Sequence, residues 1–550
     1  MDTMADSALV TPAGPLIRTA LDPVPKLARR IFVVLALLLL PIMIVASFDF
    51  GVTWDEDSRR TYGHKVLDFL RGLRTREEFR ETGGHLYPGL FDTICAALEL
   101  WIPVNKWVLR HVVNAIFGWV GVVYCGRLAG RLFGWWSGVL ALVLLALSPR
   151  YFAHSMNNPK DLPFAALSVV ALYYISTVSR RWPYISLSTG SKIAVSLALA
   201  LGVRVGALLY LGYFGLVIGG LVIAERITNW RQLADTALRV VAIAVVVLLL
   251  GTVFWPWAGG APLTRPFVAL LGVSNYPWEA FVLYRGSEHL STELPWHYAP
   301  WWLLISTPPV VLVGVACSLV FIPNRADLRR KAVVWAIAII PIVASILRSS
   351  TLYDGIRHLL FVYPVFVVLA AAGWAGVHSR ARTLLQRRLV MTALAIGVTG
   401  ALVVMIRFHP NQVAYFNALV GGPKGAFKQY DVDYWGNCML QAVKWGAERA
   451  RSSGVTVRMS GHPNHLVQQN AERYPEVVYV HDDLNRHHLE VLLARGAKRD
   501  LGRLAARPAL HHVTTADGAL LCIITAGPAL PEFGRAREGA TSPEPVAPSK

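Results

Sequence analysis

The stretch that decides the fold is IFVVLALLLLPIMIVASF, Ile31 to Phe48, followed a few residues later by the charged cluster WDEDSRR, Trp54 to Arg60. The first segment is an apolar run long enough to cross a bilayer as a helix. No small-residue cleavage site follows it, so we expect the helix to be retained. The second segment holds three acids and two bases, which places a charged cluster at a membrane surface.

Apolar runs of this kind recur along most of the 550 residues. The chain is 54% hydrophobic and only 16% charged, with a mean hydropathy of +0.45, whereas soluble domains carry about 25% charged residues. Hydropathy and the charge of the intervening loops together predict about eleven transmembrane helices. We therefore expect a polytopic α-helical membrane protein.

The net charge of +19 does not indicate a nucleic-acid partner. The basic residues lie in short bunches between apolar runs and do not form one face or tail, as expected for cytoplasmic loops. Lys26, Arg29 and Arg30 precede the first helix and place its start inside the cell. The cluster Trp54 to Arg60 then lies on the outer face.

The composition divides the chain into four expected regions. Residues 1–30 form a disordered cytoplasmic lead, and residues 31–406 form the transmembrane domain. Its first outer loop, residues 49–108, is amphipathic and is expected to carry helices that lie in the membrane interface. Residues 407–530 form a small extracytoplasmic α/β domain, and residues 531–550 form a Pro-rich disordered tail.

Within the α/β region, alternating and helical patterns can be separated. Short strands are expected over 455–460 and 477–480, and helices over 464–474 and 485–495. The segments 510–515 and 519–525 flank Asp517-Gly518, a good hairpin turn. The five cysteines are scattered and form no CxxC pair, which argues against a disulfide or a zinc site: Cys95, Cys125, Cys317, Cys438 and Cys522.

Two acidic segments could carry chemistry on the outer face. Adjacent carboxylates such as Asp55 and Glu56 can bind a cation, or one can act as a base when burial and like charges raise its pKa. The alternative is a solvated acidic patch that only fixes topology. The second segment, NNPKDLP from Asn157 to Pro163, adds Lys160 and Asp161 at the outer mouth of another helix. There, Asp at the N-cap and Pro just inside also suit a plain helix start.

Basic side chains near the outer ends of the expected helices complete the set: Arg59, Arg60, His85, Arg204, Arg357 and His358. Arg204 is the most informative, because an arginine between two apolar stretches is costly unless it is paired or faces a polar cavity. A phosphate at the interface would be a suitable partner. The alternative is that Arg204 snorkels to the lipid headgroups.

The order of these pieces resembles the GT-C superfamily of polyprenyl-phosphate-dependent glycosyltransferases, in particular the branch with protein O-mannosyltransferases and the lipid A aminoarabinose transferase. WDE at Trp54 to Glu56 is similar to the family's first-loop pattern, and HLYPGL at His85 to Leu90 resembles the segment before its interfacial helix. DLPF at Asp161 to Phe164, GVR at Gly202 to Arg204 and RHLL at Arg357 to Leu360 match later family segments in order.

The resemblance implies that Asp55 is the catalytic base of an inverting transfer, and that Glu56 and Asp161 orient the acceptor or Asp55. It implies a donor-phosphate site among basic and aromatic residues: Arg204, Lys160, Arg59, His85, Tyr87, Arg357 and His358. We expect no metal and no other cofactor; the alternative is that Glu56 and Asp161 bind a divalent metal ion.

The expected enzyme transfers a hexosyl or pentosyl group from a polyprenyl-phosphate-linked sugar donor to a lipid, glycan or protein acceptor. It would lie in the inner membrane of a bacterium, with its active site outside the cytoplasm.

Two other classes of protein fit parts of the sequence. A transporter or flippase for a lipid-linked anion would use the same outer acids and bases for binding without breaking a bond. Such proteins often show inverted repeats and interrupted helices, and neither is evident here. A scaffold whose outer domain binds a partner would suit the Tyr, Trp and His residues in 409–435.

Overall fold

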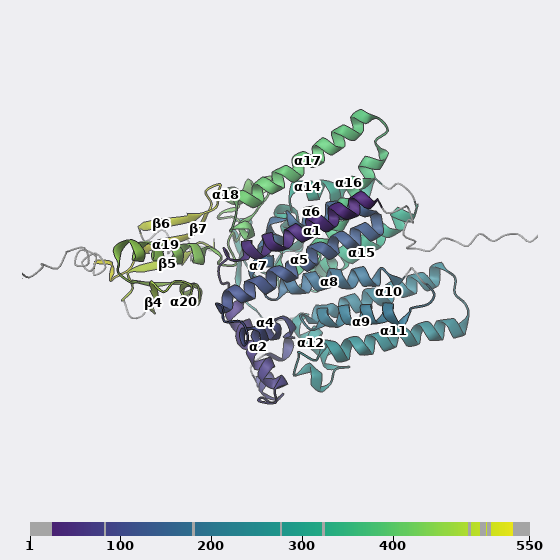
Figure 1. The fold of residues 1–550 in the computed structure, drawn as a ribbon, viewed down its shortest axis with the longest axis horizontal. Helices are drawn as coiled ribbons and strands as arrows, with labels where there is room; N and C mark the ends of the chain where they lie inside the picture. The colour runs from purple at the N-terminus through teal and green to yellow at the C-terminus, as the bar shows by residue number, and fades with distance from the viewer. Residues whose placement is uncertain are drawn as a thin grey trace, which may run out of the picture.

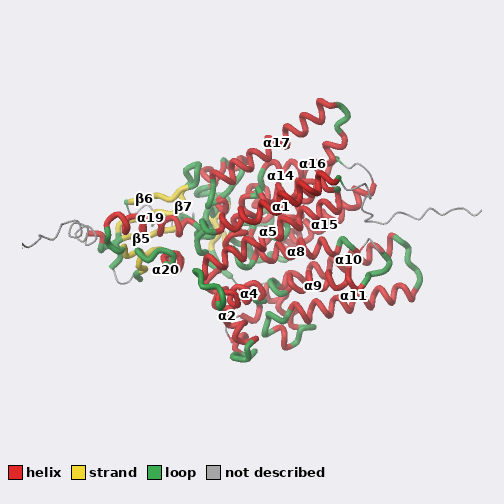
Figure 2. The backbone as a smooth tube through the Cα atoms, in the orientation of Figure 1, coloured by secondary structure: helices red, strands yellow, loops and turns green. Residues whose placement is uncertain are grey.

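The computed structural model of the protein describes residues 25–81, 84–178, 182–274, 278–321, 325–481, 486–495, 502 and 508–531. Most of the expected lead and tail lie outside these ranges. A bundle of long helices forms the body of the molecule, and a small mixed domain lies at one end of it (Figure 1). Most of the strands belong to that small domain (Figure 2).

Every apolar segment expected from the sequence forms a helix or a pair of helices. The bundle consists of α1 (Lys26–Ser47), α5 (Lys106–Phe133), α6 (Trp135–Ala146), α7 (Pro149–Asn157), α8 (Asp161–Ile175), α9 (Leu187–Leu201), α10 (Leu208–Ala224), α11 (Trp230–Gly251), α13 (Tyr298–Ser306), α14 (Pro309–Val320), α15 (Arg325–Leu347), α16 (Tyr363–Arg380) and α17 (Leu384–Arg407).

Among the described residues, six helices are long and apolar enough to cross a membrane, or up to eight if the bent pairs α6–α7 and α13–α14 each count as one span. This is fewer than the sequence predicted. The main reason is length: α8 and α9 have 15 residues each, short of the roughly 20 that cross the hydrocarbon core.

The segment 49–108, which the sequence analysis named the first outer loop, contains three α-helices and packs on the bundle. It contains α2 (Glu56–Leu70), α3 (Glu78–Glu81) and α4 (Leu90–Glu99). Helices α2 and α4 cross closely because Gly63 has no side chain: a Cβ there would lie 2.3 Å from the carbonyl oxygen of Asp92. The segment between α11 and α13 carries α12 (Arg265–Ser274) and the hairpin of β1 (Phe281–Tyr284) and β2 (Ser287–Leu290).

The C-terminal domain is built on a five-stranded sheet in the order β4-β3-β5-β7-β6. Strand β3 runs parallel to β4 and β5, and β7 runs antiparallel to β5 and β6. The elements after α17 are α18 (Gly422–Ala426), α19 (Cys438–Ser453), β3 (Val457–His462), α20 (Asn464–Ala471), β4 (Val477–Tyr479), β5 (Leu489–Leu493), β6 (Ala509–Thr514) and β7 (Leu520–Ala526).

Two predictions for this domain are wrong. The described part of 485–495 is not a helix, because Leu489–Leu493 forms β5 in the middle of the sheet with all five residues buried. A short apolar run does not distinguish a buried strand from a helix. The argument against a disulfide also fails: Cys438 of α19 and Cys522 of β7 are bonded across 84 residues of sequence.

Hydrogen bonds join the C-terminal domain to the segment between α1 and α2. The amide of Gly51 donates to Oδ1 of Asn437 (3.0 Å), and the amide of Val52 donates to Oδ1 of Asn470 (2.9 Å). Asn157 also binds both sides, since its Nδ2 donates to the Gly51 carbonyl (2.9 Å) and to Oδ1 of Asn437 (3.1 Å). These bonds fix the start of α2 relative to α7 and the domain.

Candidate active site

Asp55 lies at the N-cap of α2, where the chain leaves the bundle and turns into the first outer loop. Its Oδ2 is 3.0 Å from Nζ of Lys160 and 3.1 Å from Nη1 of Arg357. The Asp55 side chain is 23% exposed, so one edge of the carboxylate is accessible. The structure therefore brings together three residues that the sequence analysis singled out separately.

Asp161 is buried beside this group at the start of α8. It forms an ion pair with Arg204, and its Oδ2 lies 3.5 Å from Nη1 of Arg357. Asp161 does not act as the N-cap, because Oδ1 of Asn158 accepts from the amides of Lys160 (3.2 Å) and Asp161 (2.9 Å). This leaves the carboxylate of Asp161 available to the basic cluster.

Arg204 follows α9 and extends towards the acidic pair, with its side chain 21% exposed. Its partner is a carboxylate of α8, which is the paired arrangement that the sequence analysis weighed against snorkelling. Lys160 is similarly half-buried, and its Nζ lies 5.6 Å from the centre of the Tyr87 ring. These two cations are the members of the cluster that combine charge with access to solvent.

Arg357 is held more rigidly. Its side chain is 3% exposed, and its Nε lies 3.1 Å from Oδ2 of Asp354. Its Cζ lies over the rings of Tyr353 and Trp435, at 4.5 Å and 5.0 Å from the ring centres. Asp354 in turn forms an ion pair with Arg495. Two residues of the C-terminal region, Trp435 and Arg495, therefore support the cluster around Asp55.

The charges of the cluster shift one another's pKa values. Burial alone would raise the pKa of Asp55, but Lys160 and Arg357 outweigh it and hold the pKa well below its usual range. Burial lowers the pKa of Lys160 to about 8, although Asp55 opposes the shift. Burial also lowers the pKa of Arg204. Asp55 is consequently ionised at neutral pH, and the pKa of Lys160 lies close to neutral pH.

Glu56 is turned away from the cluster. It is 1% exposed, and its carboxylate accepts from the amide of Thr53 (2.8 Å) and lies 2.9 Å from Nε2 of His111. Its contacts join the first turn of α2 to α5. The carboxylate of Glu56 is therefore engaged by Thr53 and His111.

Arg59 forms a buried ion pair with Asp92. Its guanidinium donates to Oδ2 of Asp92 (2.9 Å) and to the carbonyl of Pro88 (2.9 Å). The other oxygen of Asp92 accepts from Arg110 at 2.9 Å. This buried group of Arg59, Asp92 and Arg110 joins α2, α4 and α5. The contacts of Arg59 with Asp92 and Pro88 are therefore contacts between secondary-structure elements.

His85 and His358 contribute packing. The His85 carbonyl accepts from the Trp255 indole (2.8 Å), and its ring centre lies 5.6 Å from that of Trp257. His358 is half-buried, with its ring against Tyr353 at 4.6 Å between centres. Tyr87 is different, because its ring faces Lys160 and Arg59.

The sequence analysis missed Asp354 and Arg495, and it gave Asn158 and Trp435 no part in this cluster. Asp354 is the first residue of an Asp-Gly pair in which both residues have positive φ, 56° and 67°, and this dipeptide was a usable turn signal. The others act through contacts with distant segments. No group of three or more His, Cys, Asp or Glu side chains suited to a metal ion occurs in the described ranges.

Neither a family model nor a curated protein matches the sequence. Among solved structures, ArnT from Cupriavidus metallidurans in the apo state is 13% identical, with a TM-score of 0.49 over 90% of this chain and 97% of that chain.

The Archaeoglobus fulgidus oligosaccharyltransferase is 14% identical, with a TM-score of 0.44 over 80% of this chain and 64% of that one. The Saccharomyces cerevisiae protein O-mannosyltransferase Pmt1-Pmt2 complex is 15% identical, with a TM-score of 0.33 over 49% and 39%. All three are GT-C glycosyltransferases, the superfamily that the sequence resembles. At this level of similarity, the side chains around Asp55 are the firmer guide to the chemistry.

Proposed function

We propose that the protein is an inverting glycosyltransferase that moves a sugar from a polyprenyl-phosphate donor to an acceptor hydroxyl on the extracytoplasmic face of the membrane. The observation that carries this proposal is the contact of Asp55 with Lys160 and Arg357, beside the pair of Asp161 and Arg204. The partly accessible carboxylate of Asp55 thus lies in one cluster with two partly accessible cations, Lys160 and Arg204, at an end of the helical bundle. This is what the transfer of a sugar from a phosphate requires.

Asp55 is the proposed base. Its free carboxylate oxygen takes the proton of the acceptor hydroxyl while that oxygen forms a bond to the anomeric carbon. The bond from the anomeric carbon to the phosphate oxygen breaks, and its electron pair leaves with the polyprenyl phosphate. Arg204 and Lys160 offset the charge that develops on this leaving group. Attack opposite the leaving group inverts the anomeric centre.

The low pKa of Asp55 makes the base dependent on the donor. Without a donor, Lys160 and Arg357 keep the carboxylate ionised but weakly basic. A bound phosphate competes for the same cations, so the pKa of Asp55 rises towards the range in which a carboxylate accepts a proton effectively. The base would therefore become active only when the leaving group is in place.

The position of the C-terminal domain supports an extracytoplasmic site. Its disulfide between Cys438 and Cys522 is typical of proteins that fold outside the reducing cytosol. The domain contacts the Asp55 cluster through Trp435 and Arg495. A bulky donor lipid would reach such a cluster from within the bilayer, and an acceptor would reach it from the outer side.

The test is reconstitution of the full chain in liposomes with a radiolabelled polyprenyl-phosphate sugar and an envelope extract as acceptor source. We expect free polyprenyl phosphate and labelled product of inverted configuration. Arg204→Gln should reduce transfer by roughly two orders of magnitude, as does loss of one donor to a developing charge. Arg231→Gln, at an exposed position on α11, is the matched control. Movement of intact donor between leaflets without bond cleavage would replace this proposal with a transporter.

A further inference from the structure

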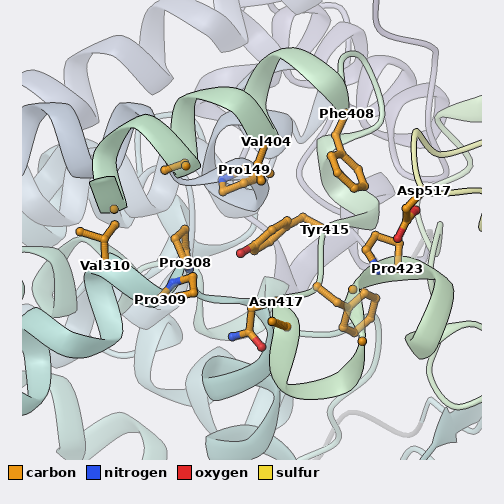
Figure 3. Close-up of a pocket in the computed structure, with 17 residues that line it drawn as sticks. Pro149, Pro308, Pro309, Val310, Val404, Phe408, Tyr415, Asn417, Pro423 and Asp517 are labelled. Atoms are coloured by element: carbon orange, nitrogen blue, oxygen red, sulfur yellow. The ribbon is translucent and has the colours of Figure 1, made fainter. Parts of the chain in front are cut away.

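A cavity of about 490 Å³ lies between the C-terminal half of α17 and the start of α14. None of its lining residues belongs to the Asp55 cluster. In Figure 3 the segment Pro308 to Val310 borders one end and Phe408 and Asp517 border the other, with the Tyr415 ring between them. Nearly all of the lining is apolar. Its volume is in the range of ordinary ligand sites.

The local sequence explains why space remains here. Helices α13 and α14 are bent by 118° at their junction, next to Pro308 and Pro309. On α17, Gly397 closes one end, because a Cβ there would lie 2.7 Å from the Val310 side chain. One turn further on, a Cβ at Gly400 would meet nothing within 4 Å. The cavity is therefore open beside Gly400.

The surroundings of α17 indicate what fills this space. The helix has 24 residues and is apolar enough to span a membrane, yet only 11% of its most apolar window is buried. Leu402, Val403 and Ile406 near the cavity are exposed. In a bilayer these side chains meet lipid tails. An apolar cavity does not hold water readily, so hydrocarbon is the available occupant.

Basic residues lie at the end of the cavity where α17 meets the C-terminal domain. Arg407 precedes the lining residue Phe408, and Lys424 follows the lining residue Pro423; both basic residues are exposed. Asp517 is the acid at this end, and its carboxylate already accepts from the backbone amide of Lys424 (3.0 Å). The rim thus has an excess of positive charge, which attracts anionic lipids.

We propose that this cavity binds an acyl chain of an anionic phospholipid from the outer leaflet, with its phosphate at Arg407 and Lys424. The bound lipid fastens α17 to α14 at the point where the C-terminal domain begins. The site is separate from the glycosyl-transfer site, and it stands whether or not the transfer is confirmed.

The test uses the full chain purified in mild detergent. Gly400→Leu fills the cavity without a clash, and Gly215→Leu is the matched control, because it adds the same side chain at an equally open position on the exposed face of α10. Native mass spectrometry should find phosphatidylglycerol retained by the native chain and by Gly215→Leu, with at least a fivefold loss in Gly400→Leu. Added phosphatidylglycerol should raise the unfolding temperature of the native chain and of Gly215→Leu, but not that of Gly400→Leu.

The double variant Arg407→Gln and Lys424→Gln tests the contribution of the lipid headgroup to binding separately from that of the acyl chain. We expect it to lose the preference for phosphatidylglycerol over phosphatidylcholine while still binding an acyl chain. Equal phosphatidylglycerol retention by Gly400→Leu and the native chain would overturn the proposal. So would photocrosslinking that places a polyprenyl phosphate, and no acyl lipid, beside Tyr415.

Discussion

Nη1 of Arg357 lies 3.1 Å from Oδ2 of Asp55, although 302 residues of sequence separate the two. Arg357 is itself anchored by Asp354 and stacked on Trp435. The orientation of the proposed base therefore depends on a contact between the first outer loop and the segment that precedes α16. This link makes the site sensitive to residues that never touch a substrate.

Lys160 predicts an alkaline limit to activity. Its pKa is lowered to about 8, mainly by burial, so a rise in pH through 8 removes a cation from the donor-phosphate site. We expect kcat/KM to fall above pH 8. Lys160→Arg should move this limb to higher pH, because arginine stays charged.

The matched control is Lys106→Arg, at an exposed pair with Glu472. It should leave the profile unchanged. An alkaline limb that stays near pH 8 in Lys160→Arg would show that another group titrates there.

Arg495 predicts a remote effect on the base. Asp354 contacts both Arg357 and Arg495. Without Arg495, we expect Asp354 to bind Arg357 more strongly and to move its guanidinium away from Asp55. We expect Arg495→Gln to lower kcat about tenfold, equivalent to roughly 1.4 kcal/mol, with a smaller change in KM. The acid limb of the pH profile should move to higher pH, because the pKa of Asp55 rises as Arg357 withdraws.

Arg451→Gln, in an exposed pair with Glu476 of the same domain, should leave kcat and the acid limb unchanged. An unchanged acid limb in Arg495→Gln would limit Arg495 to a structural role.

The disulfide predicts a count of reactive thiols. Under denaturing conditions without reductant, maleimide should label three cysteines, Cys95, Cys125 and Cys317; after reduction it should label five. Reduction should also destabilise the C-terminal domain by about 2–4 kcal/mol. The double variant Cys438→Ala and Cys522→Ala should show three labels in both conditions. Five labels without reductant would contradict the disulfide and weaken the extracytoplasmic placement.

The sequence was informative about Asp55, Lys160, Asp161 and Arg204 because each is a charge at the end of an apolar helix, and hydropathy places such ends on one side of a membrane. The resemblance to the GT-C superfamily also implied roles in the chemistry for Arg59 and Glu56. Their buried partners Asp92 and His111 were not recognisable from spacing alone, because they lie on other helices.

The C-terminal domain shows where local patterns fail. The apolar run Leu489–Leu493 fits either a helix or a buried strand, and its neighbours in the sheet decide the outcome. The bond between Cys438 and Cys522 and the stacking of Trp435 on Arg357 are tertiary contacts. No local period in the sequence encodes them.

The most direct test of the central claim is to compare transfer by Asp55→Asn with transfer by Asp57→Asn in the reconstituted system. The two variants remove one charge each from the same loop, but Asp57 is exposed on α2 and Asp55 contacts the basic cluster. With an unchanged unfolding temperature and donor binding at least as tight as in the native chain, Asp55→Asn should lose at least about 10²-fold in transfer rate, while Asp57→Asn should keep the native rate. A folded Asp55→Asn protein that transfers sugar at the native rate would contradict the assignment of the base.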